Sequence, residues 1–267
     1  MLKPPFLLYL GDIAEVTYAK TASGIAYWRP EVARGQMRFA DSPADLGLPD
    51  MSIEEAVDAG IQTLVIGVAS AGGVLPLHWI PHLKQALEAG LDVANGLHTR
   101  LEDIPELHDA ARAGGSKLHD VRFPSRNFSV GTGDPRPGRR LLSVGTDCAV
   151  GKMYTSLALH KEMSARGIKT DFRATGQTGI LIAGSGVSID AVVADFISGA
   201  AEWLSPANEP DHWDVIEGQG SLFHPSYASV SMGLLHGSQP DAFVVCHEAE
   251  RTHTYGFSHP LSDSFFD

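Results

Sequence analysis

The chain has 267 residues, of which 43% are hydrophobic, and a formal net charge of −12. A chain of this length and composition can bury one large core or two ordinary ones. The negative charge disfavours nucleic acids and anionic membranes as partners, because both repel an acidic surface. Two cysteines imply no disulfide framework, and the apolar run near the N-terminus is too short to span a bilayer. We therefore expect a cytoplasmic protein that acts on small molecules.

Strand and helix patterns alternate through the first half of the chain. Short apolar runs predict strands, and apolar residues recurring every three or four positions predict helices between them. Because strands separated by helices at this spacing are typical of a parallel sheet, we predict a Rossmann-like domain over residues 1–130. In chain order we predict a strand over 6–10, a strand over 63–68, a helix over 77–89, a strand over 91–94 and a helix over 102–113.

A change of composition marks the middle of the chain. Residues 124–140 are rich in proline, glycine and arginine, and proline and glycine interrupt regular elements. We place a linker at 131–140 and a second α/β domain at 141–267. The last residues, 260–267, follow a strand directly and have no helical period, so we expect the chain to be incomplete at its C-terminus.

The second domain opens on the most informative stretch of the chain. The apolar run 141–145 ends in a glycine, and Gly151 and Lys152 follow at the start of a helical pattern that ends near Ala165. A strand, a glycine-containing loop, a lysine and a helix N-terminus are typical of a phosphate-binding loop (P-loop). The predicted cofactor-binding residues are Gly145, Thr146, Asp147, Cys148, Ala149, Val150, Gly151, Lys152 and Met153.

The residue after the P-loop lysine departs from the usual pattern. Ser or Thr is usual there, and its hydroxyl holds Mg²⁺. This chain has Met153, and a thioether is a poor ligand for a hard cation. The loop is therefore predicted to bind a phosphate, while the ordinary arrangement of metal and nucleotide is in doubt.

Polar residues gather after the strands of the second half. We predict further strands over 168–173, 214–217 and 241–246, and a helix over 190–204. Ligands of open α/β sheets bind at the carboxyl ends of the strands, so the loops there should form the active site. Besides the P-loop, these loops are 173–179, 217–224 and 246–251, with Arg173, Gln177, Glu217, Gln219, Ser221, His224, His247, Glu248 and Arg251 as their polar residues.

Two of these residues suit proton transfer. Glu217 is followed by glycine, which permits close approach of a ligand, so we interpret it as a general base or metal ligand rather than a helix cap. His247 could be a base near neutral pH or a packed surface residue. Cys148 could be a nucleophile if the helix N-terminus lowers its pKa, but we favour a small packed residue. The histidines have no ligand-like spacing, and we predict no metal site.

The chain resembles two families. The P-loop and the stretch 214–220 resemble the G-T-D-T-x-V-G-K-T loop and the strand ending in V-E-G-A-G of dethiobiotin synthetase and related amide-forming ligases. A closer resemblance covers nearly the whole chain, and on it the chain is identified as a member of the family long called domain of unknown function 1611. Its marks are 145–153, Phe-Arg-Ala-Thr-Gly-Gln-Thr-Gly at 172–179, Glu-Gly-Gln-Gly-Ser at 217–221, and His-Glu with Arg-Thr at 247–252.

The closer resemblance implies a function. It implies a Rossmann-like domain followed by a P-loop domain, and N-acetyl transfer from acetyl-CoA to an acidic amino acid, most simply D-glutamate, in D-amino-acid catabolism. It also implies an N-acetyl-D-glutamate racemase of the enolase superfamily as a pathway neighbour. We expect a homo-oligomer. Members of the family continue beyond the point where this chain ends, in agreement with the expected incompleteness.

An acetyltransferase would use the candidate residues as follows. Lys152 and the loop backbone would hold a CoA phosphate with no metal required. Glu217 or His247 would take the proton of the attacking amine. Glycine-loop N–H groups or the Gln177 amide would stabilise the oxyanion. Guanidinium groups would pair with the carboxylates of the substrate. The predicted substrate-binding residues are Arg173, Gln177, Ser221 and Arg251.

Two other functions remain open at this point. An ATP-dependent ligase or kinase would use the same loop, with Asp147 and Glu217 holding Mg²⁺ in place of the missing hydroxyl. A protein that senses nucleotide or CoA would bind the ligand without turnover. The concentration of polar residues in the loops after the strands favours an enzyme over a sensor.

Overall fold

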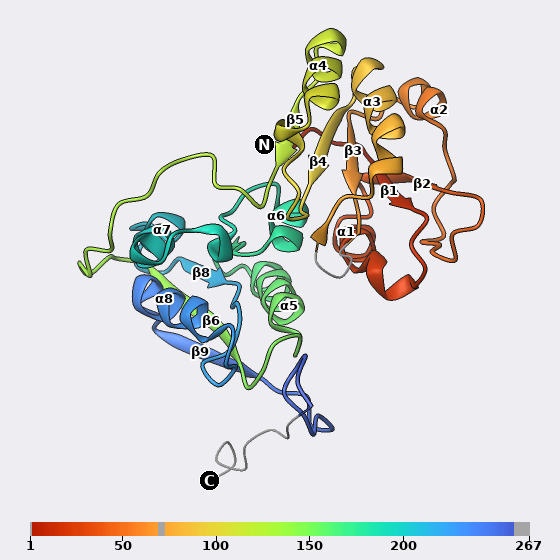
Figure 1. Ribbon diagram of the computed structural model, residues 1–267. Helices are drawn as coiled ribbons and strands as arrows, with labels where there is room; N and C mark the ends of the chain where they lie inside the picture. Colours follow the sequence, from red (N-terminus) through yellow and green to blue (C-terminus); the bar gives the residue numbers. More distant parts are fainter. Residues whose placement is uncertain (1, 69–72, 259–267) are drawn as a thin grey trace. The chain divides into compact units, whose positions relative to one another are not determined.

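The computed structural model describes residues 2–68 and 73–258 of the chain (Figure 1). The chain divides into two compact units, Met1–Phe123 and Pro124–Asp267. The stretch 260–267, on which we based the expectation of incompleteness, lies outside the described residues. Among the helices that are described, none has both the length and the apolar composition that a bilayer crossing requires.

The first unit is built on a parallel five-stranded sheet in the order β2-β1-β3-β4-β5. Its β1 is buried along its whole length, as an apolar strand in the middle of a parallel sheet must be. The chain order reverses at β1, which confirms the predicted Rossmann-like class. The elements are β1 (Phe6–Gly11), α1 (Lys20–Trp28), β2 (Ala33–Arg38), α2 (Ile53–Asp58), β3 (Thr63–Ile66), α3 (Ile80–Glu88), β4 (Asp92–Asn95), α4 (Pro105–Gly114) and β5 (Leu118–Asp120), with 3-10 turns at Val16–Ala19, Leu77–Trp79 and Leu101–Asp103.

The predicted elements of this unit are present, but four others were missed. The helix predicted over 77–89 begins as a 3-10 turn, because Pro81 lies in the first turn of α3. The missed elements are α1, β2, α2 and the short β5. In β2 the side chain of Gln36 is buried and donates to Asp45 Oδ1 at 2.9 Å and Asp50 Oδ1 at 3.0 Å. A polar residue satisfied by distant partners hides the strand from an apolar pattern.

The second unit has a parallel four-stranded sheet in the order β7-β8-β6-β9. The P-loop follows β6, which has a neighbour on each side, so the loop emerges from the middle of the sheet. The elements are β6 (Arg139–Gly145), α5 (Lys152–Ala165), β7 (Thr170–Arg173), α6 (Gln177–Ala183), α7 (Ile197–Leu204), β8 (Trp213–Ile216), α8 (Ala228–Ser238) and β9 (Ala242–Cys246), with 3-10 turns at Ile189–Ala191 and Ala194–Phe196.

The sequence patterns of this unit located its strands better than its helices. The single helix predicted over 190–204 is wrong: two 3-10 turns precede α7, because the β-branched pair Val192 and Val193 has extended backbone with ψ of 134° and 136°. The loop predicted over 173–179 contains the start of α6 at Gln177. The helix α8 was not predicted.

The two faces of the second sheet pack against different helices. Strand alternation puts Leu142 and Ile216 on the face where they pack with residues of α7 and α8. Ser143 points to the opposite face, where its hydroxyl accepts a hydrogen bond from Ser156 of α5 at 2.9 Å. The P-loop and the residue that follows Ile216 therefore belong to the α5 side of the sheet.

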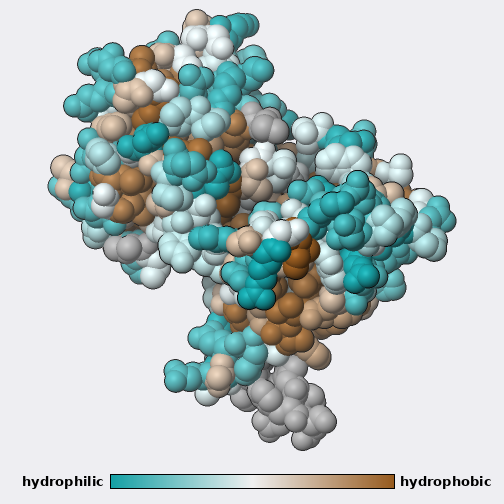
Figure 2. All heavy atoms as spheres, turned by 180° about the vertical axis from the view of Figure 1, so that it is seen from behind, coloured by the Kyte–Doolittle hydropathy of each residue, from teal (hydrophilic) through white to brown (hydrophobic). Residues whose placement is uncertain are grey.

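The edge strand β9 leaves part of the α7–α8 face uncovered. Its residues Phe243 and Val245 pair in register with Leu142 and Val144, so all four side chains share that face. The side chains on β9 are nevertheless 49% and 65% exposed. Figure 2 shows hydrophobic surface gathered on the second unit. The helices thus cover the centre of this face but not its β9 edge.

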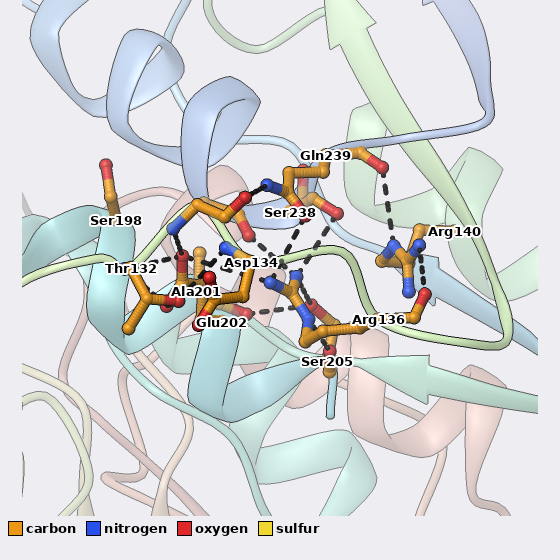
Figure 3. A network of polar contacts seen from close by, with 12 residues as sticks. Thr132, Asp134, Arg136, Arg140, Ser198, Ala201, Glu202, Ser205, Ser238 and Gln239 are labelled. Carbon is orange, nitrogen blue, oxygen red and sulfur yellow. Dashed lines mark hydrogen bonds and ion pairs between the residues drawn. The ribbon is translucent and has the colours of Figure 1, made fainter. Parts of the chain in front are cut away.

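A polar network fastens the start of the second unit to α7 and α8 (Figure 3). The Glu202 carboxylate of α7 accepts the N–H groups of Thr132 at 2.9 Å and Gly133 at 2.8 Å. The Arg136 guanidinium donates to Ser205 O at 3.0 Å and to Gly237 O at 2.8 Å. These bonds satisfy carbonyl groups near the C-termini of both helices, which have no partner within the helix. The segment before β6 is therefore part of the folded unit.

The Glu202 carboxylate should stabilise this segment in a pH-dependent way. Burial alone would raise its pKa, but the N–H groups of Thr132 and Gly133 outweigh burial and lower the pKa from its ordinary value of 4.5. The stabilisation is then complete above pH 4.5 and is lost as the pH falls through the lowered folded-state pKa. We expect Glu202→Gln to cost about 1–3 kcal/mol at pH 7 and much less at low pH.

Hydrogen exchange of peptides covering 128–136, at pH 7 and at low pH, measures this effect. The exposed Glu162 of α5, which pairs with Arg166 just after the helix, provides the matched control Glu162→Gln. Equal protection of the segment in the Glu202→Gln and Glu162→Gln variants would contradict the role of Glu202.

Candidate active site

The backbone of the P-loop is shaped to bind an anion. Ala149 and Gly151 have positive φ values of +53° and +94°, whereas Val150 between them does not, so the sign of φ alternates along the loop. Such alternation makes a concave nest of N–H groups. No acceptor within the described residues takes a hydrogen bond from the N–H groups of Ala149, Val150 or Gly151. The loop therefore presents unsatisfied donors at the N-terminus of α5, where the helix dipole also favours negative charge.

Lys152 brings a positive charge to the same place. Its side chain is 7% exposed, and its Nζ donates to Asp147 O at 2.8 Å. Burial lowers the pKa of this ammonium group, with the nearby Cys148 and Cys246 opposing the shift. A Cβ at Gly145 would lie 3.0 Å from Nζ, so the glycine leaves room for the lysine. An anion on the loop would satisfy this ammonium group.

Asp147 is held by donors of the protein itself. Its Oδ1 accepts from Cys148 N at 2.6 Å, and its Oδ2 accepts from Tyr255 N at 2.7 Å and Arg251 Nη1 at 3.1 Å. Burial alone would raise its pKa, but these donors outweigh burial and the pKa is lowered. Asp147 therefore stays ionised and joins the P-loop to the segment that follows β9.

Glu217 lies buried at the end of β8, on the α5 side of the sheet. Its Oε2 accepts from Thr175 N at 2.8 Å and Gly176 N at 3.2 Å, and its Oε1 accepts from Gln219 Nε2 at 3.2 Å. Burial raises its pKa to about 7, against the opposing effect of these donors and of Lys152. This carboxyl group therefore changes its charge near neutral pH, close to the P-loop lysine.

The structure shows further residues at the site that the sequence analysis did not select as candidates. Ser143 lies in the apolar run of β6, and its hydroxyl accepts Gly218 N at 2.8 Å. A Cβ at Gly218 would overlap Ser143 O, so only glycine permits this approach of β6 to the loop after β8. Thr175 donates its hydroxyl to Glu217 O at 2.6 Å. A serine inside the apolar run 141–145 was the available clue.

The two arginines expected to bind substrate carboxylates are already paired. The Arg173 guanidinium donates to Asp214 Oδ1 at 2.7 Å and Asp171 Oδ2 at 3.0 Å, both nearer the amino ends of the strands. Alternation along β8 puts Asp214 and Glu217 on opposite faces, so Arg173 is not brought together with Glu217. Arg251 is bound to Asp147 and to Glu248.

The other predicted residues lie around the loops as follows. His247 Nδ1 and Thr146 Oγ1 are 3.0 Å apart, which brings this exposed histidine to the P-loop. Ser221 is buried and accepts from Phe223 N at 3.3 Å. Gln177 is half-buried at the first position of α6, and Met153 is half-buried in the first turn of α5. Burial raises the pKa of the Cys148 thiol, which argues against an activated nucleophile.

The donor set around the loop does not suit Mg²⁺. The two carboxylates that would have to replace the missing hydroxyl, Asp147 and Glu217, each accept hydrogen bonds on both oxygens. Ligand atoms of Asp147, Cys148 and His224 lie within 4.8 Å of one another. However, His224 Nε2 donates to Tyr255 O at 2.9 Å and its Nδ1 accepts from Ser226 N at 3.2 Å. A cation here would have to displace these bonds beside Lys152 and Arg251.

The position of the Glu217 carboxylate depends on Gly179. A Cβ at this buried position of α6 would overlap Glu217 Oε2. We expect Gly179→Ala to push the carboxylate off the Thr175 and Gly176 N–H groups and to lower the free energy of unfolding by about 1–3 kcal/mol.

A double-mutant cycle with Glu217→Ala, measured by urea unfolding, checks the cause. Because Glu217→Ala removes the overlapping atom, adding Gly179→Ala to it should cost much less than in the wild-type background. Equal costs in the two backgrounds would contradict the contact.

Comparison with known proteins places the chain in a family. The model described as "Domain of unknown function (DUF1611_N) Rossmann-like domain" matches residues 36–124, and that described as "Domain of unknown function (DUF1611_C) P-loop domain" matches residues 129–264. A protein from Tritonibacter scottomollicae named D-glutamate N-acetyltransferase is 56% identical over 256 residues, which are 96% of this chain and 77% of that protein. A protein of the same name from a Pseudoalteromonas species is 52% identical over 258 residues, 97% of this chain and 78% of its own length.

A solved structure agrees with both family models. The crystal structure of a DUF1611 family protein from Anabaena variabilis matches with a TM-score of 0.86 and 36% sequence identity, over 97% of this chain and 79% of that one. With both halves of the chain matched, the resemblance seen in the motifs is confirmed: the chain belongs to the DUF1611 family.

Proposed function

We propose that the protein is an acetyltransferase that moves an acetyl group from acetyl-CoA to the amine of D-glutamate. Two relatives more than 50% identical to nearly the whole chain carry the name D-glutamate N-acetyltransferase, which supports the reaction and the acceptor. The choice of acetyl-CoA as donor depends on the P-loop. A cytoplasmic location is part of the proposal.

We choose acetyl-CoA as the donor because the P-loop is suited to bind an anion but not a metal ion. Among the described residues, the N–H groups of Ala149, Val150 and Gly151 have no acceptor, and Lys152 adds a buried ammonium group to the same loop. Met153 lies where a metal-binding hydroxyl is usual. CoA carries a diphosphate and a ribose phosphate, and binding either requires no metal ligand from the protein. Acetyl transfer from a thioester likewise needs no Mg²⁺.

This binding mode changes what Glu217 and His247 can do. The pantetheine arm of CoA separates the diphosphate from the thioester, so a phosphate on the loop puts the reacting carbon well away from Lys152. Glu217 interacts electrostatically with Lys152, and His247 contacts Thr146 of the loop. We therefore assign both residues to the phosphate end of the ligand rather than to proton removal from the amine.

The alternative of an ATP-dependent ligase or kinase gains no support from the site. It requires carboxylates free to hold Mg²⁺, and both candidates are engaged by N–H donors. One assay compares the functions directly: acetyl-CoA with a panel of D- and L-amino acids, followed by release of the CoA thiol. Thiol release with D-glutamate supports the proposal. Its absence together with stabilisation by ATP and Mg²⁺ alone would overturn it.

Lys152→Ala should weaken the binding of acetyl-CoA. A hydrogen bond to a charged group is worth about 1.5–3 kcal/mol, so we expect the KM for acetyl-CoA to rise roughly ten- to a hundredfold. The KM for D-glutamate should change little. Steady-state kinetics with each substrate varied in turn measures both, and Lys161→Ala, on the exposed part of the same helix, is the control. An unchanged KM for acetyl-CoA in Lys152→Ala would contradict the assignment.

The charge of Glu217 should make this binding depend on pH. With a pKa of about 7, the carboxyl group is neutral at lower pH and becomes negative at higher pH, beside the bound phosphate. We expect the KM for acetyl-CoA to rise about three- to tenfold between pH 6 and 8, because the carboxylate repels the phosphate. Glu217→Gln keeps the shape of the side chain without the charge and should flatten this dependence. An identical pH profile in the two proteins would rule out Glu217 as its source.

A further inference from the structure

We propose that Arg251 positions the P-loop for phosphate binding by holding the carbonyl groups of Cys148 and Ala149, so that the N–H groups beyond them face the ligand. This role rests on the proposed function. It replaces the role of substrate clamp that the sequence suggested for this arginine.

The guanidinium group of Arg251 grips two consecutive carbonyls of the loop. Its Nη1 donates to Cys148 O at 2.8 Å, and its Nη2 makes a longer contact with Ala149 O at 3.4 Å. The fork of a guanidinium can serve two acceptors at once, which the single ammonium group of a lysine does less well. Arg251 therefore binds the backbone of the loop at the point where the nest forms.

Because of the geometry of the peptide bond, these hydrogen bonds from Arg251 also fix the orientation of the N–H groups that follow the two carbonyls. In a trans peptide the C=O of one residue and the N–H of the next point in opposite directions. Carbonyls of Cys148 and Ala149 that point toward Arg251 thus turn the N–H groups of Ala149 and Val150 away from it. These are two of the donors that have no acceptor among the described residues. The cation and the phosphate would lie on opposite sides of the same two peptide groups.

The hydrogen bonds from Arg251 also offset the backbone strain at Ala149. Ala149 has a φ of +53°, a left-handed conformation that costs an alanine roughly 1–2 kcal/mol. The loop needs this conformation at Ala149 to bring successive N–H groups to one side. A charge-assisted hydrogen bond to a carbonyl on each side of the strained residue can hold the backbone there in the absence of ligand.

Arg251 is itself fixed by its neighbours. Its side chain is 15% exposed, and it forms ion pairs with Asp147, at 3.1 Å, and with Glu248. The Asp147 carboxylate also accepts Tyr255 N, and Tyr255 O accepts from the buried His224. The segment from Glu248 to Tyr255 is thus tied to the P-loop and to the loop after β8. Because two carboxylates already pair with its single positive charge, Arg251 is held in this framework rather than available to a substrate carboxylate.

The conservative variant Arg251→Lys tests the positioning role when substrates with and without the CoA phosphates are compared. Arg251→Lys keeps the charge but loses the fork, so we expect the KM for acetyl-CoA to rise about tenfold while kcat changes less than twofold. S-acetylpantetheine carries the same thioester without the diphosphate, and with it the kcat/KM of Arg251→Lys should equal that of the wild type. Arg166→Lys, in the exposed pair with Glu162, is the control for the substitution itself.

Hydrogen exchange supplies a second readout that does not depend on turnover. CoA should slow the exchange of amides in the peptide 146–153 of the wild-type protein, and slow it less in Arg251→Lys at equal CoA concentration. A merely structural arginine would instead lower kcat/KM equally for acetyl-CoA and S-acetylpantetheine, and that result would overturn the proposal.

Comparing the Arg251→Lys and Lys152→Ala variants distinguishes a failure of the positioning role of Arg251 from a failure of the proposed function. A raised KM for acetyl-CoA in Lys152→Ala, without one in Arg251→Lys, would overturn the positioning role and leave CoA binding by the loop in place. If neither variant distinguished acetyl-CoA from S-acetylpantetheine, the loop would not be the phosphate site and the positioning role would be overturned, while thiol release with D-glutamate would still test the acetyl transfer separately.

Discussion

A buried ammonium group requires hydrogen-bond acceptors or negative charge around it, and the arrangement of the site in the second unit depends on this requirement of Lys152. Within the described part of the chain, the Nζ of Lys152 has one hydrogen-bond acceptor, the carbonyl of Asp147. The carboxyl group of Glu217 interacts with it electrostatically but is itself buried, which favours the neutral form. The lysine therefore lacks a full counter-charge. A bound phosphate would supply it, and the unsatisfied N–H groups of the loop would bind the same anion.

The rest of the site prevents the protein from supplying that counter-charge itself. Asp147 is close to the lysine, but its carboxylate is paired with Arg251 and with backbone N–H groups. Glu217 is held by the Thr175 and Gly176 N–H groups, and Gly179 leaves room for it there. Each carboxylate has donors of its own, so the lysine and the nest remain available to a ligand. This division of partners also leaves neither Asp147 nor Glu217 free for Mg²⁺, which fits the methionine that follows the lysine.

Much of the fold could be predicted because strands of a parallel sheet are buried on both faces and read as apolar runs. The strands β1 and β3 have this character. The strands β6 and β9 are less completely buried but still contain apolar runs. The missed strand β2 carries Gln36, which is buried only because Asp45 and Asp50 accept its hydrogen bonds. The interrupted helix before α7 was missed because its apolar spacing continues through Val192 and Val193, whose backbone is extended. Local pattern thus failed where distant partners or backbone conformation decided the structure.

The sequence by itself determined the chemical identity of the site: a strand, a glycine loop, a lysine and a helix start are contiguous, and their local order is enough to make a phosphate-binding nest. It also placed Glu217 at the end of a neighbouring strand. Only the tertiary structure decided which charges are free. Arg173 and Arg251 look alike in the sequence as candidate clamps, yet each is paired with a carboxylate that a distant part of the chain brings to it, Asp214 and Asp147 respectively. Pairing of charges is a property of distance in space, and the ion pair between Asp147 and Arg251 joins residues that are 104 positions apart in the sequence.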